Sequence, residues 1–355
     1  MPTFIAILTF TRTIIQMKNK AVLPGGHKYF LEAYKGIRFQ HGGVGNSDVE
    51  KILLEEGYQP IRFPEGRRFW ITFKRFQAMN RWLRCIPDGA EIVCQFPVYP
   101  RMYRLMMNKL SGRNIRLVIL IADIDGLKTG NKEMLEEEIK LLKTAKNFIV
   151  HNSNMEAWLR QYIPAANASQ LGPFDFLAAP ASANRTKSRE ICFAGNLAKS
   201  GFLEHLAGIP GLNFHLYGKG ITSDMLSQDN CRYHGIFEPA VMPGIIKGSF
   251  GLVWDGESVS GPSGSLGEYM HYIFHHKVSL YILAGMPIIA PVFAGSAEYI
   301  RSEGIGWLVR SLEEIPDLVN KITEEEYRLV IERMRPLAAE ISTGRHLKNA
   351  LHDLD

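Results

Sequence analysis

Residues 115–123 read IRLVILIAD and carry the strongest strand signal in the chain. The run is apolar, rich in β-branched residues and about as long as a buried strand. Residues 99–114 before it and 134–146 after it place apolar side chains at helical spacing. A buried strand between two helices predicts a parallel sheet, because parallel strands need a crossover connection, usually a helix.

The same alternation of strands and helices extends in both directions from this segment. It begins near residue 36 and is interrupted at residues 164–188, which are rich in Pro, Ala, Ser and Asn and predict a linker. A second alternation then follows to about residue 340. The sequence therefore predicts an α/β protein with two Rossmann-like domains facing each other across a cleft, where ligands meet the carboxyl ends of the strands.

The expected boundaries follow this pattern. They are an N-terminal extension (1–30), a first domain on the acceptor side (31–165), a linker (166–188), a second domain (189–335) and a C-terminal helix that could pack back on the first domain (336–355). The extension could be a strand, a membrane-touching segment or the product of a start placed too far upstream.

The first domain is expected to open with a strand at 36–40 and a glycine-rich turn before a helix. Asn46 or Ser47 can cap that helix, and Gly57 can end it. The turn does not read GxGxxG, and no acidic residue ends a second strand at the usual distance, so a dinucleotide site has little support.

Composition narrows the function classes. Residues 1–170 hold 25 Lys/Arg and 15 Asp/Glu, whereas the remainder holds 16 and 21. A basic first half suits an anionic membrane surface or an anionic acceptor, or it reflects surface bias alone.

The four cysteines form no CxxC pair, which favours a reduced cytoplasmic compartment. No apolar run is long enough to span a bilayer.

Residues 275–289 read HHKVSLYILAGMPII and predict a helix that begins near Lys277 and leads into a strand. A helix N-terminus disfavours cations unless an anion lies among them. A diphosphate held by Lys277, the Ser279 hydroxyl and the helix amides would satisfy this condition. Alternatively, Lys277 bends toward solvent and the histidines cap the helix.

Three other segments carry candidate chemistry. In the first, a strand runs into Gly195 and Asn196, and Lys199 follows, where it could grip the same diphosphate or be an ordinary solvated lysine. In the second, Asp123 and Asp125 end the strongest strand, where they could act as a general base, hold Mg²⁺ or Mn²⁺, or only cap the next turn.

The third segment, 67–84, combines six basic with five aromatic side chains. As a helix it could rest on an anionic membrane surface. Alternatively, it is an amphipathic helix whose aromatic side packs in the core.

An ordered set of motifs resembles one enzyme group. FAGNLAKSGFL (193–203), LYGKG (216–220), YHGIFEP (233–239), GSFGLVWDG (248–256) and residues 269–315 resemble bacterial GT-B glycosyltransferases. In the first half GNSDVEKILLEEGY (45–58), QFPVY (95–99), residues 116–128 and residues 147–159 match the same group in the same order. The group comprises galactofuranosyltransferases and the glucosyltransferase that extends sugars on serine-rich adhesins.

The resemblance implies a donor-binding set in this chain. Lys277 and its neighbours fall where the family contacts the nucleotide diphosphate, and Lys199 falls where a basic residue grips the phosphates. The full expected set is Asn46, Ser47, Asn196, Lys199, Tyr217, Gly218, His276, Lys277, Val278, Ser279 and Glu298. Asp123 and Asp125 are the expected catalytic residues.

Two departures from the family pattern stand out. Ala122 replaces the histidine of the family's HDID motif, so Asp123 must substitute as base or the mechanism differs. Ile273 and Phe274 precede the HHK motif where the family often has asparagine and proline. GT-B enzymes generally need no metal, so no metal and no cofactor is expected.

The expected function is transfer of a hexose, galactofuranose or glucose, from a UDP-sugar to a bacterial polysaccharide, a lipid-linked oligosaccharide or a glycoprotein glycan. The alternatives are a GT-B-like binding partner without catalysis and, less well supported, a nicotinamide-dependent oxidoreductase. The expected partners are the UDP-hexose and the glycan, with peripheral contact at the inner face of the membrane left open. A homo-oligomer is also left open, and no nucleic acid is expected.

Overall fold

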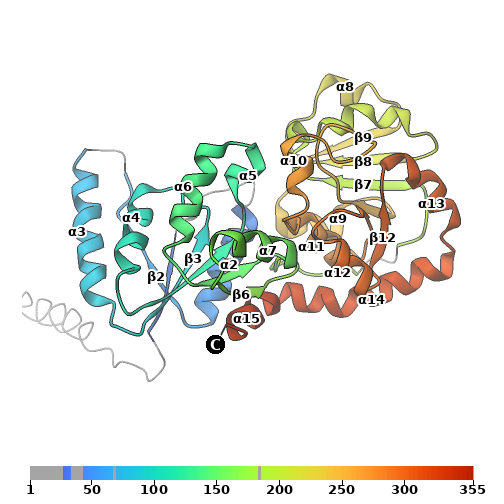
Figure 1. Ribbon diagram of the computed structural model, residues 1–355. Coiled ribbons are helices and arrows are strands. Elements are labelled where there is room, and N and C mark those ends of the chain that lie inside the picture. The colour runs from blue at the N-terminus through green and yellow to red at the C-terminus, as the bar shows by residue number, and fades with distance from the viewer. Residues whose placement is uncertain (1–26, 33–42, 67–68, 183–184, 355) are drawn as a thin grey trace, which may run out of the picture.

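The computed structural model describes residues 27–32, 43–66, 69–182 and 185–354. It contains two parallel six-stranded sheets, ordered β2-β1-β3-β4-β5-β6 and β12-β11-β10-β7-β8-β9. Each sheet lies in its own α/β domain, and the two domains stand side by side (Figure 1). The expected pair of α/β domains is confirmed.

The first sheet is buried on both faces by its helices. Alternate residues of its strands enter two apolar clusters, so that Phe30, Val118 and Ile149 face one side while Leu31, Ile119 and Phe148 face the other. Its strands are β1 (Lys28–Leu31), β2 (Gln59–Ile61), β3 (Glu91–Phe96), β4 (Arg116–Ile121), β5 (Asn147–Val150) and β6 (Asn167–Gln170). Its helices are α2 (Gly43–Glu55), α3 (Phe69–Cys85), α4 (Arg101–Leu110), α5 (Asp125–Thr129), α6 (Lys132–Leu142) and α7 (Ser153–Tyr162).

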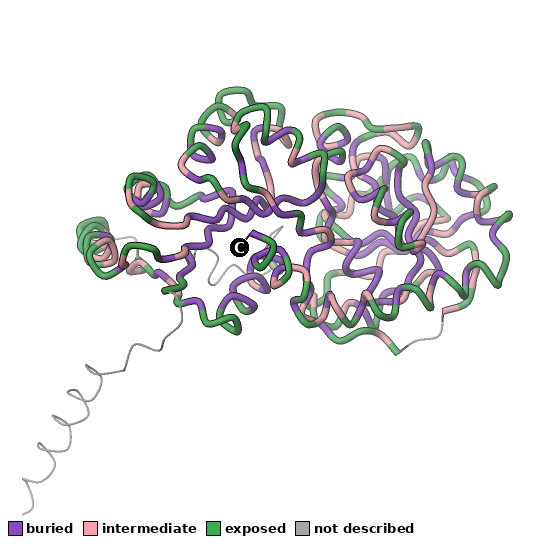
Figure 2. The backbone as a smooth tube through the Cα atoms, turned by 60° about the horizontal axis from the view of Figure 1, so that its bottom comes forward, coloured by how far each residue is buried: buried purple, intermediate pink, exposed green. Residues whose placement is uncertain are grey.

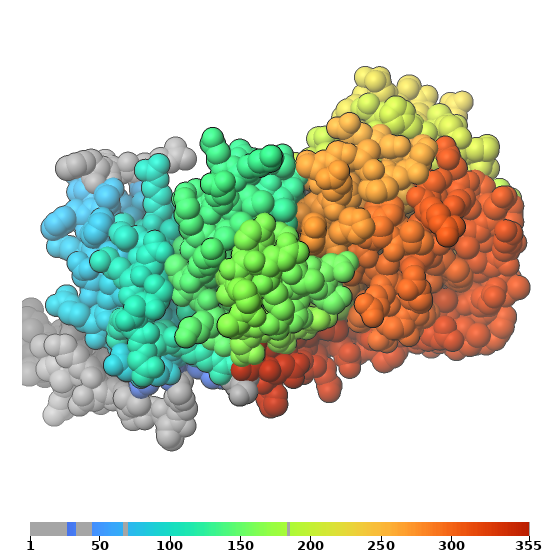
Figure 3. Space-filling model, viewed as in Figure 1, coloured from blue at the N-terminus to red at the C-terminus, as the bar shows by residue number. Residues whose placement is uncertain are grey.

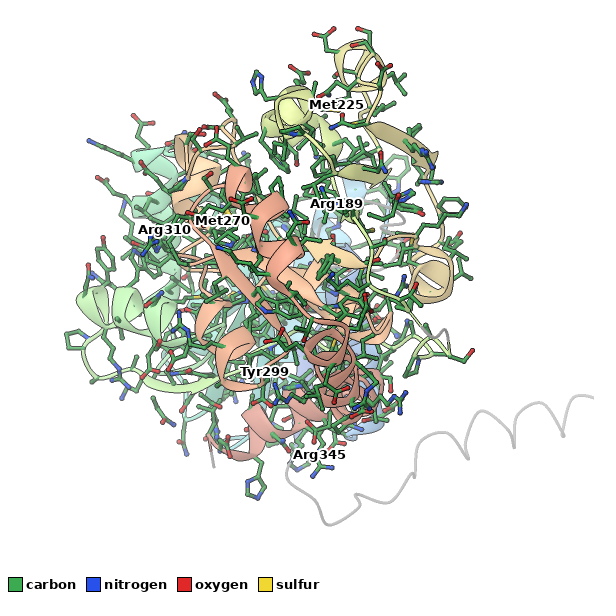
Figure 4. All side chains as sticks on the ribbon, turned by 90° about the vertical axis from the view of Figure 1, so that its right-hand side faces the viewer. Arg189, Met225, Met270, Tyr299, Arg310 and Arg345 are labelled. Atoms are coloured by element: carbon green, nitrogen blue, oxygen red, sulfur yellow. The ribbon has the colours of Figure 1, made fainter. Side chains whose placement is uncertain are left out.

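The second sheet is built in the same way. Its strands are β7 (Glu190–Ala194), β8 (Asn213–Tyr217), β9 (Cys231–Gly235), β10 (Phe250–Leu252), β11 (Ile288–Pro291) and β12 (Gly306–Val309). Its α-helices are α8 (Ser223–Leu226), α9 (Met242–Ile245), α10 (Gly264–Tyr269), α11 (His276–Leu283), α12 (Ala297–Ser302) and α13 (Ile315–Lys321). Figure 4 views the molecule from the side of this domain, with Met225 of α8 at the top.

Two short strands lie where other structure was expected. Strand β1 falls partly within the expected extension, yet it pairs with both β2 and β3. Strand β6 falls within the expected linker and pairs with β5. Each has only four residues, too few to show a periodicity, and tertiary pairing rather than local pattern stabilises them. The strand expected at 36–40 and most of the extension lie outside the described residues.

Helix α2 begins earlier than its sequence indicated. It starts at Gly43, so Asn46 and Ser47 lie within its first turns and do not cap it. Its end follows the expectation: Gly57 has φ 82°, and the Gly57 and Tyr58 amides donate to the Leu54 and Leu53 carbonyls. This is a glycine-terminated helix end, which satisfies carbonyls that the helix leaves open.

The sequence patterns of residues 199–208 and 239–248 predict two helices of the second domain, but both segments are mostly short 3₁₀ turns. Residues 201–208 form a 3₁₀-helix, and the 239–248 segment contains only a 3₁₀ turn and the four-residue α9. Glycines lie at both ends of the first segment, and two prolines and two glycines interrupt the second, which shortens regular helices.

The chain returns to the first domain at its end. Helix α14 (Glu324–Ser342), with Pro336 inside it, runs along the second domain, and α15 (Arg345–His352) packs against α2. Asp175 holds the start of α15 by accepting from the His346 and Leu347 amides at 3.2 and 2.8 Å. Burial along both sheets is shown in Figure 2.

Helix α3 divides its aromatic residues between the core and the solvent. Met79 is buried and Trp82 packs against the core, whereas Trp70, Phe73 and Phe76 are 51%, 66% and 42% exposed. The alternative in which the aromatic side packs in the core therefore holds for only part of the helix. Among the described residues no helix combines the length and apolarity needed to cross a membrane.

Candidate active site

A cavity of about 360 Å³ opens at the carboxyl ends of β7 and β8, against the first domain. The first domain contributes Gly45 of α2, and the linker contributes Phe176. The second domain contributes the turn after β7, the turn after β8 and the start of α11. The two domains also touch through α5 and α10, and Figure 3 shows their surfaces in contact along this junction.

Lys277, in the first turn of α11, is held by three groups. Its Nζ donates to the Trp254 carbonyl at 3.1 Å and to Asp255 Oδ1 at 3.2 Å, and it lies 4.3 Å from the centre of the Phe193 ring. His275 Nε2 lies 2.7 Å from the other oxygen of Asp255. The sequence predicts an anion among His275, His276 and Lys277, and the Asp255 carboxylate is such an anion, supplied by the chain itself.

Asp255 is a functional candidate that sequence reasoning missed. Burial alone would raise the pKa of its carboxyl, but the charge of Lys277 and the contact with His275 outweigh burial and hold that pKa well below its usual range. The available signal was its place at the end of residues 250–255, whose pattern predicts a strand and whose last side chain would meet the carboxyl edge of the sheet.

The His276 ring lies between the second domain and Gly45 of the first domain. Its ring lies 5.6 Å from the Phe174 ring and 5.1 Å from the Phe176 ring, measured between centres. A Cβ added at Gly45 would come within 2.9 Å of it. Burial lowers the pKa of His276, which favours the neutral ring. Its Nε2 has no hydrogen-bond partner among the described residues.

Gly218 brings the turn after β8 close to the turn after β7. Its φ is 131°, and a Cβ there would lie 1.8 Å from the Gly195 carbonyl oxygen. Only glycine fits this approach. Lys219, an exposed lysine in the LYGKG motif, follows it and lines the cavity, although the sequence did not single it out.

The cavity gathers five residues of the expected donor-binding set. These are Asn196, Tyr217, Gly218, His276 and Lys277. Asn196 Oδ1 is buried without a hydrogen-bond partner among the described residues. The Tyr217 ring stacks on His234 at 4.7 Å, and its hydroxyl accepts from the Lys247 amide.

The other expected donor residues do not line this cavity. Val278 and Ser279 are buried, and the Ser279 hydroxyl donates to the Phe174 carbonyl at 2.6 Å, so in this structure it is directed away from any phosphate. Asn46 is buried, Ser47 is half-buried, and Lys199 is exposed. For Val278 and Ser279 the physical reason is the helical repeat: His276, Lys277 and Leu280 lie on the side of α11 that faces the cavity, whereas Val278 and Ser279 lie on the side that faces the core.

Glu298 lines a second, polar cavity of about 260 Å³ between α7 and α12. Ser153, Asn154, His271 and Arg301 line the same cavity. Asn154 Nδ2 donates to the His271 carbonyl at 3.0 Å, so the cavity bridges the two domains.

The expected catalytic carboxylates lie at the carboxyl end of β4 and line neither of these cavities. Lys128 Nζ donates to Asp123 Oδ2 at 2.6 Å, and the Tyr99 hydroxyl donates to Asp125 Oδ2 at 2.8 Å. Glu138, not Asp125, accepts from the first amides of α5. Burial raises the pKa of Glu138.

His151 joins the two domains next to these carboxylates. Its Nε2 lies 2.9 Å from the Ala122 carbonyl, and its Nδ1 accepts from the Phe274 amide at 3.2 Å. These partners require a neutral ring protonated at Nε2. Burial lowers the pKa of His151 to about 4.

A third cavity, of about 790 Å³, lies in the first domain between α3 and α4. It sits at the carboxyl ends of β1 and β2, where Glu32 and Arg62 form a two-point ion pair at 2.6 and 2.7 Å. Thr72, Arg75 and Arg101 line it as well. Among the described residues no group of three or more His, Cys, Asp or Glu side chains could hold a metal ion.

Two domain families match the chain. Residues 28–162 match the family described as Glucosyltransferase 3-like, N-terminal domain, and residues 191–354 match its C-terminal counterpart. Glucosyltransferase 3 of Streptococcus gordonii is 36% identical over 87% of this chain and 92% of its own. Beta-1,6-galactofuranosyltransferase WbbI of Escherichia coli (strain K12) is 29% identical over 78% of this chain and 82% of its own.

Solved structures agree on the fold. Anabaena Alr3699/HepE, crystallised with UDP-glucose, has a TM-score of 0.58 at 13% identity and covers 92% of this chain and 97% of its own. A glycosyltransferase from Rickettsia africae has a TM-score of 0.57 at 12% identity, covering 92% of this chain and 98% of its own. The GT-B fold expected from the sequence is confirmed.

Proposed function

The chain belongs to the glucosyltransferase 3-like family of GT-B glycosyltransferases, and we propose that it transfers glucose or galactofuranose from a UDP-sugar to a glycan acceptor. The start of α11 carries this proposal. There a helix N-terminus, Lys277 and His276 meet in one interdomain cavity. The buried Nε2 of His276 has no hydrogen-bond partner among the described residues.

The donor diphosphate is proposed to lie over the first turn of α11. Lys277 has three N–H donors; Trp254 and Asp255 accept from two, and a phosphate oxygen is proposed to accept from the third in place of the Phe193 ring contact. The free amides at the start of the helix add further donors, and Lys219 adds a charge at the rim. Groups that are fixed before the reaction stabilise the charge that develops on the leaving diphosphate.

The remaining expected residues keep defined roles in the proposal. Asn196, Tyr217 and Gly218 would meet the nucleoside, and Lys199 would approach the phosphates from solvent. Asn46 and Ser47 would face the donor from α2, through backbone rather than side-chain groups for the buried Asn46. Glu298 would meet the sugar from its own cavity, while Val278 and Ser279 would hold Lys277 in place.

The acceptor is proposed to enter from the first domain. Asp123 is the proposed base for the acceptor hydroxyl, because it follows the carboxyl end of β4, where ligands of parallel sheets bind, and the contact with Lys128 Nζ at 2.6 Å holds its carboxylate in place. Asp125 would orient the acceptor together with Tyr99.

No metal takes part in the proposed reaction, so the rate of turnover should be the same with and without a chelator. The protein is proposed to act in the cytoplasm, because its four cysteines are free and the proposed donor is a UDP-sugar.

Calorimetry with UDP tests the donor site. We expect Lys277→Ala to weaken binding by at least about 30-fold, because it removes a partly buried charged donor. Lys219→Ala, at an exposed position, should weaken binding about tenfold without affecting folding. Lys321→Ala, an exposed lysine on α13, is the matched control. Unchanged affinity in both site variants would refute the site.

One departure from the family pattern keeps a second function in view. Ala122 stands where the family often has a histidine, and this favours a binding protein without catalysis. UDP binding without turnover on UDP-glucose, UDP-galactose, UDP-galactofuranose and UDP-N-acetylhexosamines would support that alternative.

A further inference from the structure

Helix α3 presents an exposed surface that the proposed reaction does not use. It lies at the edge of the first domain farthest from the second domain (Figure 1). Phe73 and Phe76 are 66% and 42% exposed, and Trp70 is 51% exposed. Large aromatic side chains gathered on one exposed face mark an interaction site more often than chance exposure does.

The charge of the same helix is of one sign. Its 17 residues include Lys74, Arg75, Arg81 and Arg84 but no Asp or Glu. Lys74, Arg81 and Arg84 are exposed. At 3.6 residues per turn, Trp70, Phe73, Arg81 and Arg84 fall within a sector of about 80°. Aromatic and cationic groups therefore share one outward face.

We propose that helix α3 docks this protein on a lipid bilayer with anionic headgroups. The aromatic rings would enter the boundary between headgroups and acyl chains, and the cations would meet lipid phosphates. The net positive charge of residues 1–170 adds long-range attraction to such a surface. This inference goes beyond the proposed transfer reaction and does not depend on it.

The position of the helix gives docking a consequence for the acceptor. The inner side of α3 contributes Thr72 and Arg75 to the 790 Å³ cavity at the carboxyl ends of β1 and β2. Arg75 is fixed there by bonds from its guanidinium to the Pro64 and Gly66 carbonyls at 2.9 and 3.1 Å. One face of the helix would thus contact the bilayer while the other borders a cavity large enough for an acceptor headgroup.

Vesicle co-sedimentation of the full-length chain tests the proposal. The native protein should bind vesicles of phosphatidylcholine mixed with phosphatidylglycerol, bind phosphatidylcholine alone much more weakly, and be released by salt. Phe73→Ser combined with Phe76→Ser should abolish most binding. Arg81→Gln combined with Arg84→Gln should lower the partition coefficient about 30-fold.

Matched controls separate docking from general effects. Leu226→Ser, at an exposed apolar position on α8, and Lys321→Gln combined with Arg335→Gln should leave vesicle binding unchanged. All variants should keep the native UDP affinity, so loss of docking and failure of the donor site remain distinguishable. Because the substituted positions are exposed, melting temperatures should also match.

Three results would overturn the proposal. The first is vesicle binding that persists in both α3 variants, which would place docking elsewhere in the chain. The second is binding that ignores lipid charge. The third is a dimer, detected by sedimentation, that dissociates when Phe73 and Phe76 are replaced while the native chain ignores vesicles; this would assign the face to a second copy.

Discussion

At the scale of single residues, the site depends on a short network around Asp255. One carboxylate binds the Lys277 ammonium and the His275 ring, and these side chains are 24%, 10% and 6% exposed, respectively. The network fixes the direction of Lys277 before any ligand arrives. It also offsets much of the local positive charge, so in the proposed donor site the α11 amides and Lys219 would supply more of the attraction for a diphosphate.

Asp255→Asn should therefore destabilise the fold as well as the site. Removing one partner of a poorly solvated ion pair leaves the Lys277 charge without its counterion, and we expect a loss of about 3 kcal/mol in the free energy of unfolding by urea. Asp229→Asn, at an exposed position in the same domain, is the control. Equal stability of the two variants would show that Asp255 is not an essential partner.

At the scale of elements, the Tyr281 hydroxyl positions helix α11 against the second sheet. Tyr281 OH lies 3.2 Å from the Cys192 carbonyl and 3.1 Å from the Leu252 carbonyl, and it accepts from the Ala194 amide at 3.1 Å. The ring fits because residue 251 is glycine; a Cβ there would lie 2.3 Å from Tyr281. The contact ties the helix to two adjacent strands, β7 and β10, so the start of α11 stays aligned with the turn after β7.

Two tyrosine-to-phenylalanine variants test this contact. Tyr281→Phe leaves the buried Ala194 amide without a partner and should lower the free energy of unfolding by about 1–3 kcal/mol. Tyr299→Phe removes a buried hydroxyl that has no hydrogen-bond partner among the described residues, so it should cost little or even stabilise. Chemical denaturation measures both. Similar losses in the two variants would contradict the assigned role.

At the scale of the whole molecule, the two domains are joined at several places distant in sequence. The His151 ring links the Ala122 carbonyl to the Phe274 amide, the Tyr269 hydroxyl accepts from the Ile124 amide at 2.7 Å, and α15 adds Leu347 to the core of the first domain. The domains are therefore coupled through polar contacts that a change of protonation can alter.

The stability of the native chain should fall between pH 6.5 and 4 because of His151. Its folded pKa of about 4 lies below its usual 6.5, so the unfolded chain takes up the proton first as the pH falls. Its contribution is complete above pH 6.5 and is lost toward pH 4, about 3 kcal/mol in all. In His151→Gln this part of the pH dependence should disappear; an unchanged profile would contradict it.

Long, periodic segments could be predicted from the sequence because their patterns repeat several times. Strand β4 and helices α4 and α6 lie where hydrophobic periodicity placed them. The start of α11 was located near Lys277 for the same reason. Strands β1 and β6 were not predicted, because four residues carry no period and only pairing with neighbouring strands defines them.

By itself the sequence determined the class of this protein: two parallel α/β domains, and a cationic helix start at the carboxyl edge of the second sheet. Local patterns suffice for these features because helices and strands repeat every few residues. Only the tertiary structure decided which side chains meet. Asp255 and Lys277 are 22 positions apart in the sequence. Gly45 of the first domain lies close against the ring of His276 of the second. Such contacts depend on chain crossing and packing, which no local spacing encodes.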